Sequence, residues 1–487
     1  MNWGQRGIAT IVTFVLAGLL GPADFGTVMM AVGYVGLLRL FLEQGIGTAI
    51  VQRRDLEPRH LDAAFWMNVA WSLLLMAVAL VSSEWWARAN GLPRLASVID
   101  VLALSLPIRG LTVVQEAGLQ RELRFKTLAA RSTVSALAGG AAGIGLALAG
   151  AGVWALVGQS LVGALASLCL LWSVSGWKPG VRFSREHARS LLRFSVVVFS
   201  GDLAVYLNRR ADAVLIGFFL GPTVVGFYRL AARLVEMLLE LTVRPVQAIA
   251  LSRFSRVQDE PDELRAAVRS SIHVSAVMAV PALLAVAAAS DYIMAAVGRA
   301  WLPAAPALRI LCAAGIARAL TMAAGPMLNA VARPSVRAIA LWSTSLVHVP
   351  VFAGTASALR SAAATTQVVG MAAASTAVVL SVLAPINLLN IRRITGLSLG
   401  TIARTALPAF FAGAAAVVVI GLIAATDVLA GVPPLAALAV VGTLGALAAS
   451  AVLVGLEPGI RQTLRGGRPA LAPARVSRQR RAGLPRG

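Results

Sequence analysis

The sequence predicts an all-α integral membrane protein of about fourteen transmembrane helices, built from two parallel six-helix repeats and two further helices. Three observations support this fold class. Apolar residues make up 58% of the chain and charged residues 13%, about half the soluble norm of roughly 25%, and the mean hydropathy is +0.80. Fourteen apolar stretches can be drawn, each near the roughly 20 residues that a helix needs to cross a bilayer. A seven-residue turn also occurs twice, two hundred residues apart.

The fourteen apolar stretches follow one another with short connections. We expect spans at 5–20, 26–51, 62–83, 95–119, 127–149, 152–176, 194–219, 223–251, 270–289, 304–329, 337–356, 362–389, 405–424 and 434–455. Two lobes are predicted, 1–176 and 194–390, joined by a basic linker at 177–193. Helices thirteen and fourteen then lie within 391–456. The Arg-, Gly- and Pro-rich tail 457–487 is predicted to be disordered, because it cannot build a core.

The repeated turn reads LGPADFG at 20–26 and LGPTVVG at 220–226. In both copies it follows one apolar segment and opens another, so it marks the same external turn in each half. Six predicted helices separate the two copies, and the repeats are therefore parallel, related by an axis along the membrane normal. Two copies of one helical unit in an apolar chain are typical of a two-lobed transporter.

The distribution of Lys and Arg predicts the orientation. Alternate connections (52–61, 120–131, 177–193, 253–269, 331–337 and 391–404) together carry 21 of them, and the opposite set carries four. The tail adds eight arginines. Basic residues gather on the cytoplasmic side, so both termini are predicted to be cytoplasmic in the inner, or plasma, membrane. The net charge of +22 then reflects contact with anionic lipid rather than with nucleic acid.

Several classes of chemistry are not predicted. Cys169 and Cys312 lie inside apolar segments, and the four histidines are scattered without ligand spacing, so neither disulfides nor a metal site is expected. Lys126 and Lys178 are the only lysines, and neither lies in a Walker A loop. We therefore expect no cofactor and no enzymatic activity. Energy would come from an ion gradient, the membrane potential or the substrate's own gradient.

Charges within the predicted spans are the main functional signal. Ten are basic: Arg6, Arg39, Arg109, Arg209, Arg210, Arg229, Arg233, Arg244, Arg309 and Arg318. Seven are acidic: Glu43, Asp100, Glu116, Asp202, Asp212, Glu236 and Glu240. An arginine at mid-bilayer costs at least about 2.5 kcal/mol, so these side chains are expected to face a water-filled cavity or partners. The surplus of positive charge favours an anionic substrate, since the guanidinium fork binds phosphate well.

The span 223–251 carries the clearest pattern. Its six polar residues, Arg229, Arg233, Glu236, Glu240, Arg244 and Gln247, share one helical face by their spacing. The equivalent span 26–51 carries Arg39 and Glu43 at i, i+4. Two such faces are predicted to meet across a shared central cavity. The candidate substrate-binding set is Arg39, Glu43, Arg109, Arg209, Arg210, Arg229, Arg233, Glu236, Glu240, Arg244, Arg309 and Arg318.

A structural alternative exists for part of this set. Arg39–Glu43, Arg233–Glu236 and Glu240–Arg244 have the spacing of intrahelical ion pairs that neutralise one another. Arg109, Arg309 and Arg318 have no acid at i±3 or i±4. They are therefore the strongest candidates for binding a negative group.

Several motifs resemble the polysaccharide flippases of the Wzx type, and within them the WzxC-like branch of the polysaccharide transporter family. They are LLGPADFG at 19–26, QGIGTAIVQR at 44–53, AFWMN at 64–68, DAVLIG at 212–217 and GFYRLA at 226–231. The resemblance covers roughly residues 5–270; beyond that it rests on hydropathy and helix count.

This resemblance implies the fold of the multidrug/oligosaccharidyl-lipid/polysaccharide exporter superfamily, in which two six-helix lobes form a V around a central cavity. The last two spans look similar to the additional helices of peptidoglycan lipid flippases. Arg39 to Glu43 resembles a motif whose arginine lines the cationic cavity there. One departure is Gly18, where many relatives have arginine. A phosphate ligand from the first helix is therefore not expected in this chain.

The leading hypothesis is a flippase for an undecaprenyl-diphosphate-linked oligosaccharide, the repeat unit of an exopolysaccharide, O-antigen or capsule, working by alternating access. The expected partners are this lipid-linked substrate, anionic lipids and, in the same process, a polysaccharide polymerase and glycosyltransferases. One alternative is a cation-coupled small-molecule exporter of the same fold. A membrane glycosyltransferase or polymerase would need a large external loop, and none here exceeds about fourteen residues. A lipid-binding scaffold without transport is the third alternative.

Overall fold

The structure is a computed structural model, and it describes residues 3–43, 46–53, 55–180, 206, 212–426, 428–429 and 431–456. Helices make up the described chain, which contains no strand. The predicted tail at 457–487 and most of the predicted linker lie outside the described residues. The division into two lobes and a linker at 177–193 therefore stays a prediction in its boundaries.

The first half begins with a long bent helix. α1 (Trp3–Glu43) changes direction at Gly21, whose φ of 76° and ψ of 169° are not helical, one residue before Pro22. The repeated turn therefore divides α1 into two helices, as the sequence predicts. The remaining elements are α2 (Ile46–Gln52), α3 (Pro58–Ala89), α4 (Pro93–Ala103), α5 (Ser105–Gly110), α6 (Val113–Arg121), α7 (Phe125–Leu148) and α8 (Trp154–Val174).

The second half repeats this beginning. Residues 212–220 are helical, Gly221 has a φ of 83°, and α10 (Pro222–Arg256) starts at the proline of the second turn. The following elements are α11 (Pro261–Ala288), α12 (Ser290–Val297), η1 (Arg299–Ala304), α13 (Ala305–Thr321), α14 (Ala324–Ala330), α15 (Pro334–Ala358), α16 (Ala364–Val378), η2 (Val379–Leu383) and α17 (Ala384–Thr395). Two further helices, α18 (Leu399–Ala425) and α19 (Pro434–Leu456), complete the described chain.

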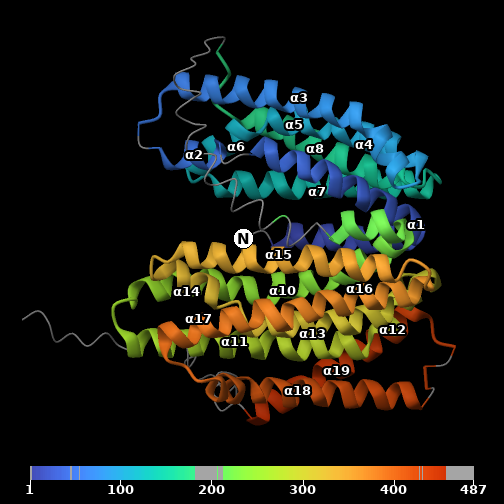
Figure 1. The fold of residues 1–487 in the computed structure, drawn as a ribbon, viewed down its shortest axis with the longest axis vertical. Helices are drawn as coiled ribbons and strands as arrows, with labels where there is room; N and C mark the ends of the chain where they lie inside the picture. Colours follow the sequence, from blue (N-terminus) through green and yellow to red (C-terminus); the bar gives the residue numbers. More distant parts are fainter. Residues whose placement is uncertain are drawn as a thin grey trace, which may run out of the picture.

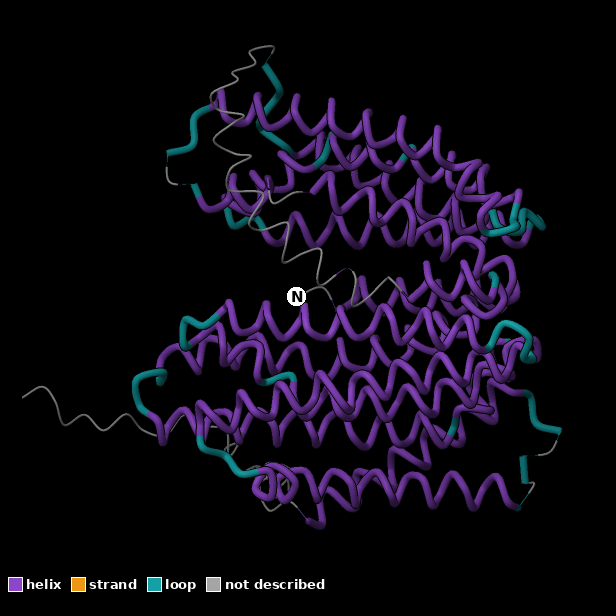
Figure 2. Tube along the Cα trace, viewed as in Figure 1, coloured by secondary structure: helices purple, strands orange, loops and turns teal. Residues whose placement is uncertain are grey.

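Two groups of helices form the molecule, as Figure 1 shows. The first lobe holds α2 to α8, and the second holds α10 to α17. α1 lies between them, packed on α4 and α7 on one side and on α10 on the other. The two groups approach each other at the end where α1 bends and diverge toward the other end (Figure 2). α18 and α19 lie outermost, against α11 and α12 of the second lobe.

The two copies of the repeated turn pack against each other. A Cβ atom on Gly26 would lie 1.8 Å from the carbonyl oxygen of Pro222, and one on Gly226 would lie 2.2 Å from that of Pro22. The glycine at the end of each turn therefore lies against the backbone of the proline in the other turn. This reciprocal contact leaves no room for a side chain at either glycine. We call this end of the molecule the turn end. The contact shows that the two halves are related by symmetry at the point where they meet.

Trp301 of η1 adds a second connection across the turn end. It is 1% exposed, and its indole Nε1 donates a hydrogen bond of 2.9 Å to the carbonyl oxygen of Ala17 in α1. Its ring makes edge contacts with Phe25 of the first turn and Phe227 of α10. One buried side chain of the second half thus contacts both halves.

The described helices include nine that are long and apolar enough to cross a membrane, or up to ten if the bent pair Pro93–Gly110 and Val113–Arg121 forms one span. These helices carry many exposed apolar side chains, such as Val81 and Leu146, as lipid contact requires. The protein is an all-α, multi-pass membrane protein. One of the nine, Gly7–Leu42, contains the bend at Gly21, and the predicted count of fourteen stays a prediction.

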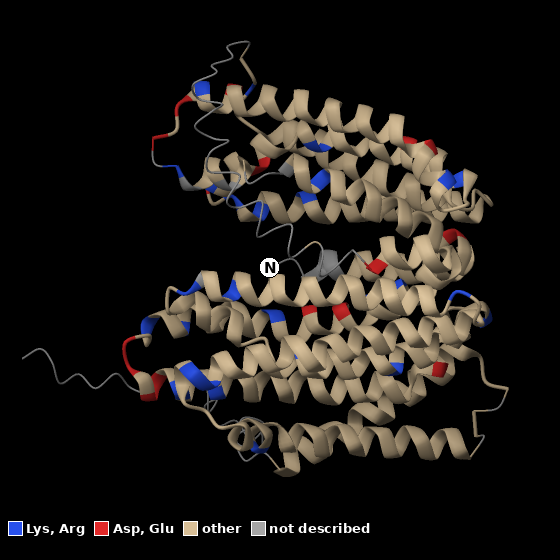
Figure 3. Cartoon of the chain, in the orientation of Figure 1, with Lys and Arg blue, Asp and Glu red and all other residues tan. Residues whose placement is uncertain are grey.

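Charged residues concentrate at the ends of the helices, with a smaller set inside each lobe (Figure 3). The basic connections between α2 and α3, α6 and α7, α10 and α11, α14 and α15, and α17 and α18 lie together, opposite the turn end. We call this the basic end. The assignment of this end to the cytoplasm stays a prediction from the charge count.

Candidate functional site

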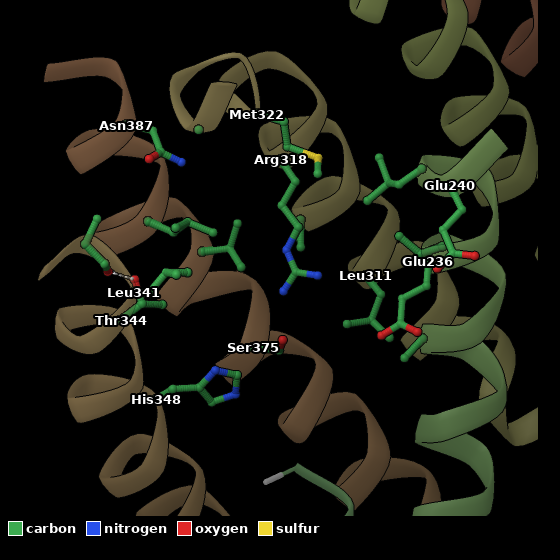
Figure 4. Close-up of a pocket in the computed structure, with 18 of the residues that line it drawn as sticks. Glu236, Glu240, Leu311, Arg318, Met322, Leu341, Thr344, His348, Ser375 and Asn387 are labelled. Atoms are coloured by element: carbon green, nitrogen blue, oxygen red, sulfur yellow. Dashed lines mark hydrogen bonds between the residues drawn. The ribbon is translucent and has the colours of Figure 1, made fainter. Parts of the chain in front are cut away.

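A pocket of about 300 Å³ lies inside the second lobe. Its walls come from α10, α13, α14, α15, α16, η2 and α17, together with Asp212. The charged lining residues are Asp212, Glu236, Glu240, Arg244, Arg318 and Arg337. Figure 4 shows Glu236 and Glu240 on one wall, His348 and Asn387 on the opposite wall, and Arg318 reaching between them.

The polar face of α10 forms one wall of this pocket. Glu236, Glu240, Arg244 and Gln247 all line it, so the spacing of these residues in the sequence correctly placed them on one face. Gln247 is held by a 2.9 Å hydrogen bond from its Nε2 to the carbonyl oxygen of Met322. The wall is therefore tied to the end of α13.

Arg229, about two turns from Glu236 toward the turn end, has a different environment. It is 5% exposed and forms an ion pair of 3.2 Å with Asp212. Asp212 also accepts a hydrogen bond from the backbone N–H of Ala213. A buried charge of this kind requires its counter-charge. The pair therefore fixes the residues before the second turn to α10.

Glu240 lies between two arginines. It pairs with Arg244 at 3.6 Å and approaches Arg233 at 4.0 Å. The predicted intrahelical pair Glu240–Arg244 is thus confirmed. Arg233 is oriented toward Glu240, seven residues on, rather than toward Glu236, three residues on, because two full turns of α10 bring residues i and i+7 back to the same face.

Positive charge exceeds negative charge around the pocket. Five guanidiniums, those of Arg229, Arg233, Arg244, Arg318 and Arg337, lie in its lining or are paired with its lining carboxylates, of which there are three. The surplus agrees in sign with the one counted over the predicted spans. The lining itself holds as many carboxylates as guanidiniums, so the surplus comes from the arginines behind it.

Arg318 and His348 are two groups of the pocket lining that are available to a ligand. Arg318 is half-buried in the last turn of α13 and has no ion-pair or hydrogen-bond partner for its side chain among the described residues. His348 of α15 is 6% exposed, and its Nε2 is buried without a hydrogen-bond partner in the described part of the chain. Its ring contacts Phe352, with 4.2 Å between the ring centroids. The sequence offered no signal for His348, because an isolated histidine has no distinctive spacing.

The structure corrects the reason for choosing Arg109. Its Nη1 lies 2.5 Å from the carboxylate of Glu116, which also pairs with Arg131 at 3.0 Å. These three residues belong to the first lobe. The i±4 search missed Glu116 because it lies seven residues from Arg109, beyond the break between α5 and α6.

The reason for choosing Arg309 is corrected in the same way. Its guanidinium donates to Ser290 at 2.7 Å and to the carboxylate of Asp291, both at the start of α12. About half of its side chain is exposed. The acid precedes it across a helix break, where helical spacing rules do not apply.

Arg39 lies on α1 and is exposed, outside the pocket. All pocket-lining residues come from the second half, so the pocket is not the predicted cavity shared between Arg39 and the face of α10. The side chain of Glu43, and Arg209 and Arg210, lie outside the described residues. Among the residues that the structure describes, no group of three His, Cys, Asp or Glu side chains is placed to hold a metal ion.

Comparison with known proteins identifies the family. The model of a family described as "Polysaccharide biosynthesis protein" matches residues 15–306, more than half of the chain. The chain belongs to this family. The match covers the first lobe, both copies of the repeated turn and α10.

Three curated relatives carry the comparison further. The succinoglycan biosynthesis transport protein ExoT of Rhizobium meliloti is 27% identical over 63% of this chain and 63% of its own length. The lipopolysaccharide biosynthesis protein WzxC of Escherichia coli K12 is 25% identical over 67% of each chain. The teichuronic acid biosynthesis protein TuaB of Bacillus subtilis is 28% identical over 61% of this chain and 62% of its own length. The matched part thus spans a little under two thirds of ExoT and TuaB.

Solved structures show the same fold. The lipid II flippase MurJ, in an inward closed conformation, superposes with a TM-score of 0.71 at 13% identity, covering 93% of this chain and 97% of MurJ. An inward-facing multidrug MATE transporter gives a TM-score of 0.58 at 15% identity, covering 81% of this chain and 96% of that one. Identities this low establish the fold alone. The predicted fold, an all-α membrane protein with two lobes, is confirmed.

Proposed function

We propose that this chain is a flippase for a lipid-linked oligosaccharide. The substrate would be an undecaprenyl-diphosphate-linked repeat unit, moved from the cytoplasmic to the outer leaflet of the inner membrane. The names of ExoT, WzxC and TuaB place these relatives in the biosynthesis of three different polysaccharides, and ExoT is named as a transport protein. The names of these relatives all refer to a polysaccharide, but to a different one in each case.

The observation that carries the proposal is the charged pocket inside an apolar helical lobe. Each arginine held at membrane depth costs at least about 2.5 kcal/mol, and a lobe with only a structural task would replace such residues with apolar ones. A diphosphate headgroup offers the compensating charge, through bidentate bonds to guanidinium. The lipid tail can stay in the bilayer while the headgroup enters between the lobes.

Alternating access follows from the geometry of the two ends. The lobes diverge toward the basic end, where the headgroup enters, and meet at the turn end. In the proposed cycle the headgroup is drawn in by Arg39, Arg233 and Arg244. The lobes then rock, the reciprocal contact of the two turns opens, and the headgroup leaves on the outer side. Both termini remain on the cytoplasmic side.

A reconstituted assay tests the proposal. The full chain is placed in proteoliposomes with a fluorescent undecaprenyl-diphosphate oligosaccharide, and a glycosidase added outside reads the sugar that has reached the outer leaflet. We expect transfer faster than in protein-free liposomes. Arg244→Glu should abolish it, because a carboxylate at this wall repels diphosphate where little water screens the charge.

The matched control is Arg94→Glu, a charge reversal at an exposed position near the turn end. It should insert and transport like the wild type. Transfer no faster than in empty liposomes for the wild-type chain would contradict the proposed function. Equal transfer by the Arg244→Glu and wild-type proteins would show that this wall of the pocket does not take part in transport.

A further inference from the structure

The pocket of the second lobe contains two groups, Arg318 and His348, for which the described residues supply no hydrogen-bond or ion-pair partner. Arg318 comes from α13 and His348 from α15, and the close-up in Figure 4 shows both directed into the same space. Neither side chain has a hydrogen-bond or ion-pair partner within the described residues. A guanidinium can only donate hydrogen bonds, and His348 Nε2 donates in one of its two neutral tautomers, so the two groups together suit one small acceptor of negative charge.

We propose that this pocket binds one acidic sugar residue, whose carboxylate or phosphate is received by Arg318 and His348. The proposal rests on the proposed function, because the sugar would be part of the lipid-linked oligosaccharide. It goes further by assigning Arg318 and His348 to the glycan, in the pocket whose α10 wall carries Arg244, one of the arginines expected to hold the diphosphate. It also names the substrate class as an acidic glycan.

Phe352 and Tyr228 hold the histidine wall in place. The ring of His348 lies against Phe352, which is fully buried, and Phe352 in turn contacts Tyr228 with 6.1 Å between the ring centroids. Packing on this scale restricts the imidazole to one orientation. His348 Nε2 therefore points to a fixed place, which is what recognition of an oxyanion needs.

The remainder of the pocket suits hydroxyl groups. Glu236 has no ion-pair partner within the described residues and offers carboxylate acceptors on the wall opposite His348. Ser375 and Asn387 add groups that donate and accept. A sugar ring carries several hydroxyls that need acceptors, whereas a bare phosphate would meet Glu236 with repulsion. The presence of both signs in one pocket therefore favours an acidic sugar over a simple anion.

The volume of the pocket also favours one sugar ring over several. About 300 Å³ lies at the small end of ligand pockets, which span roughly 300–1,000 Å³. One sugar ring fits this space, and a chain of several does not. The rest of the oligosaccharide would extend along the open side of the pocket.

Binding to the purified full-length protein in nanodiscs tests the proposal, with calorimetry as the readout. The probes are glucuronate, glucose 1-phosphate, glucose and inorganic phosphate. We expect glucuronate or glucose 1-phosphate to bind about tenfold or more tightly than glucose, and more tightly than phosphate. Glucuronate alone would identify a carboxylate as the anion, and glucose 1-phosphate alone would identify a phosphate.

The variants are Arg318→Gln and His348→Gln, and each should lose this preference for the acidic sugar. Arg309→Gln is the control, because it removes a guanidinium from the same helix outside the pocket. An unchanged melting temperature shows that each variant is folded. Binding that is absent in the wild type, equal for glucose, or unchanged in Arg318→Gln would overturn the proposal. If the acidic sugar binds but the protein does not translocate the lipid-linked oligosaccharide in proteoliposomes, the proposed function is contradicted and the sugar site is not.

Discussion

At the scale of single residues, Gly18 shows how closely the first helix approaches the second half of the chain. A Cβ atom there would lie 2.7 Å from the carbonyl oxygen of Val297, at the end of α12 in the second half. The first helix therefore approaches the second half too closely for any side chain at this position. An arginine here would force the turn end apart. The sequence showed that the charge is missing, and the structure supplies the reason.

Gly18→Ala is expected to destabilise the protein by about 1–3 kcal/mol, the usual cost of overpacking, because the new Cβ meets backbone. The control is Gly7→Ala in the same helix, where a Cβ atom would have nothing within 4 Å. Alanine favours helix there, so that variant should gain up to about 1 kcal/mol. Thermal unfolding in detergent compares the two, and equal stabilities would refute the close approach.

At the scale of elements, regular helices were predictable and broken ones were not. The face of α10 follows from spacing alone, because α10 runs without a break from Glu236 to Gln247. The partners of Arg109 and Arg309 could not be found this way, since α5 and α6, and α12 and α13, are separate helices. The pocket itself joins seven elements that are distant in sequence, and no local pattern predicts such a meeting. His348 belongs to the site only because these elements pack together, and not because of any pattern in the sequence.

The triad in the first lobe gives a prediction at this scale. Glu116 is 16% exposed and forms ion pairs with both Arg109 and Arg131. Glu116→Gln removes the carboxylate that these two largely buried guanidiniums share, and we expect a loss of about 3 kcal/mol. Glu84→Gln is the control, because its pair with Arg88 is about three-quarters exposed and contributes at most about 1 kcal/mol. Similar unfolding temperatures for the two variants would show that the triad does not stabilise the lobe.

At the scale of the whole molecule, close contacts at the turn end add to the packing of α1 on α10 in holding the two halves together. The reciprocal contacts of Gly26 and Gly226, with the hydrogen bond from Trp301 to Ala17, join halves that diverge elsewhere. Trp301→Phe keeps the ring contacts and removes the hydrogen bond. A net loss of about 0.5–1.5 kcal/mol should raise the population open at the turn end by roughly two- to tenfold.

Pulsed electron spin resonance measures this population. Spin labels on Arg94→Cys and Ser361→Cys, both exposed near the turn end of opposite lobes, report the separation. Cys169 and Cys312 are first replaced by serine and alanine. The Trp301→Phe protein should show a larger share of long distances. An identical distribution in both proteins would mean that Trp301 does not hold the turn end closed.

α18 and α19 pack on α11, α12 and each other, on the flank of the second lobe away from α1 (Figure 1). A binder attached to the connection between these two helices would therefore travel with one lobe and leave the other untouched. Such an antibody fragment would serve as a fiducial mark for electron cryo-microscopy. It would break the pseudo-symmetry that makes the lobes hard to tell apart at low resolution, without bridging the parts whose relative motion is to be imaged.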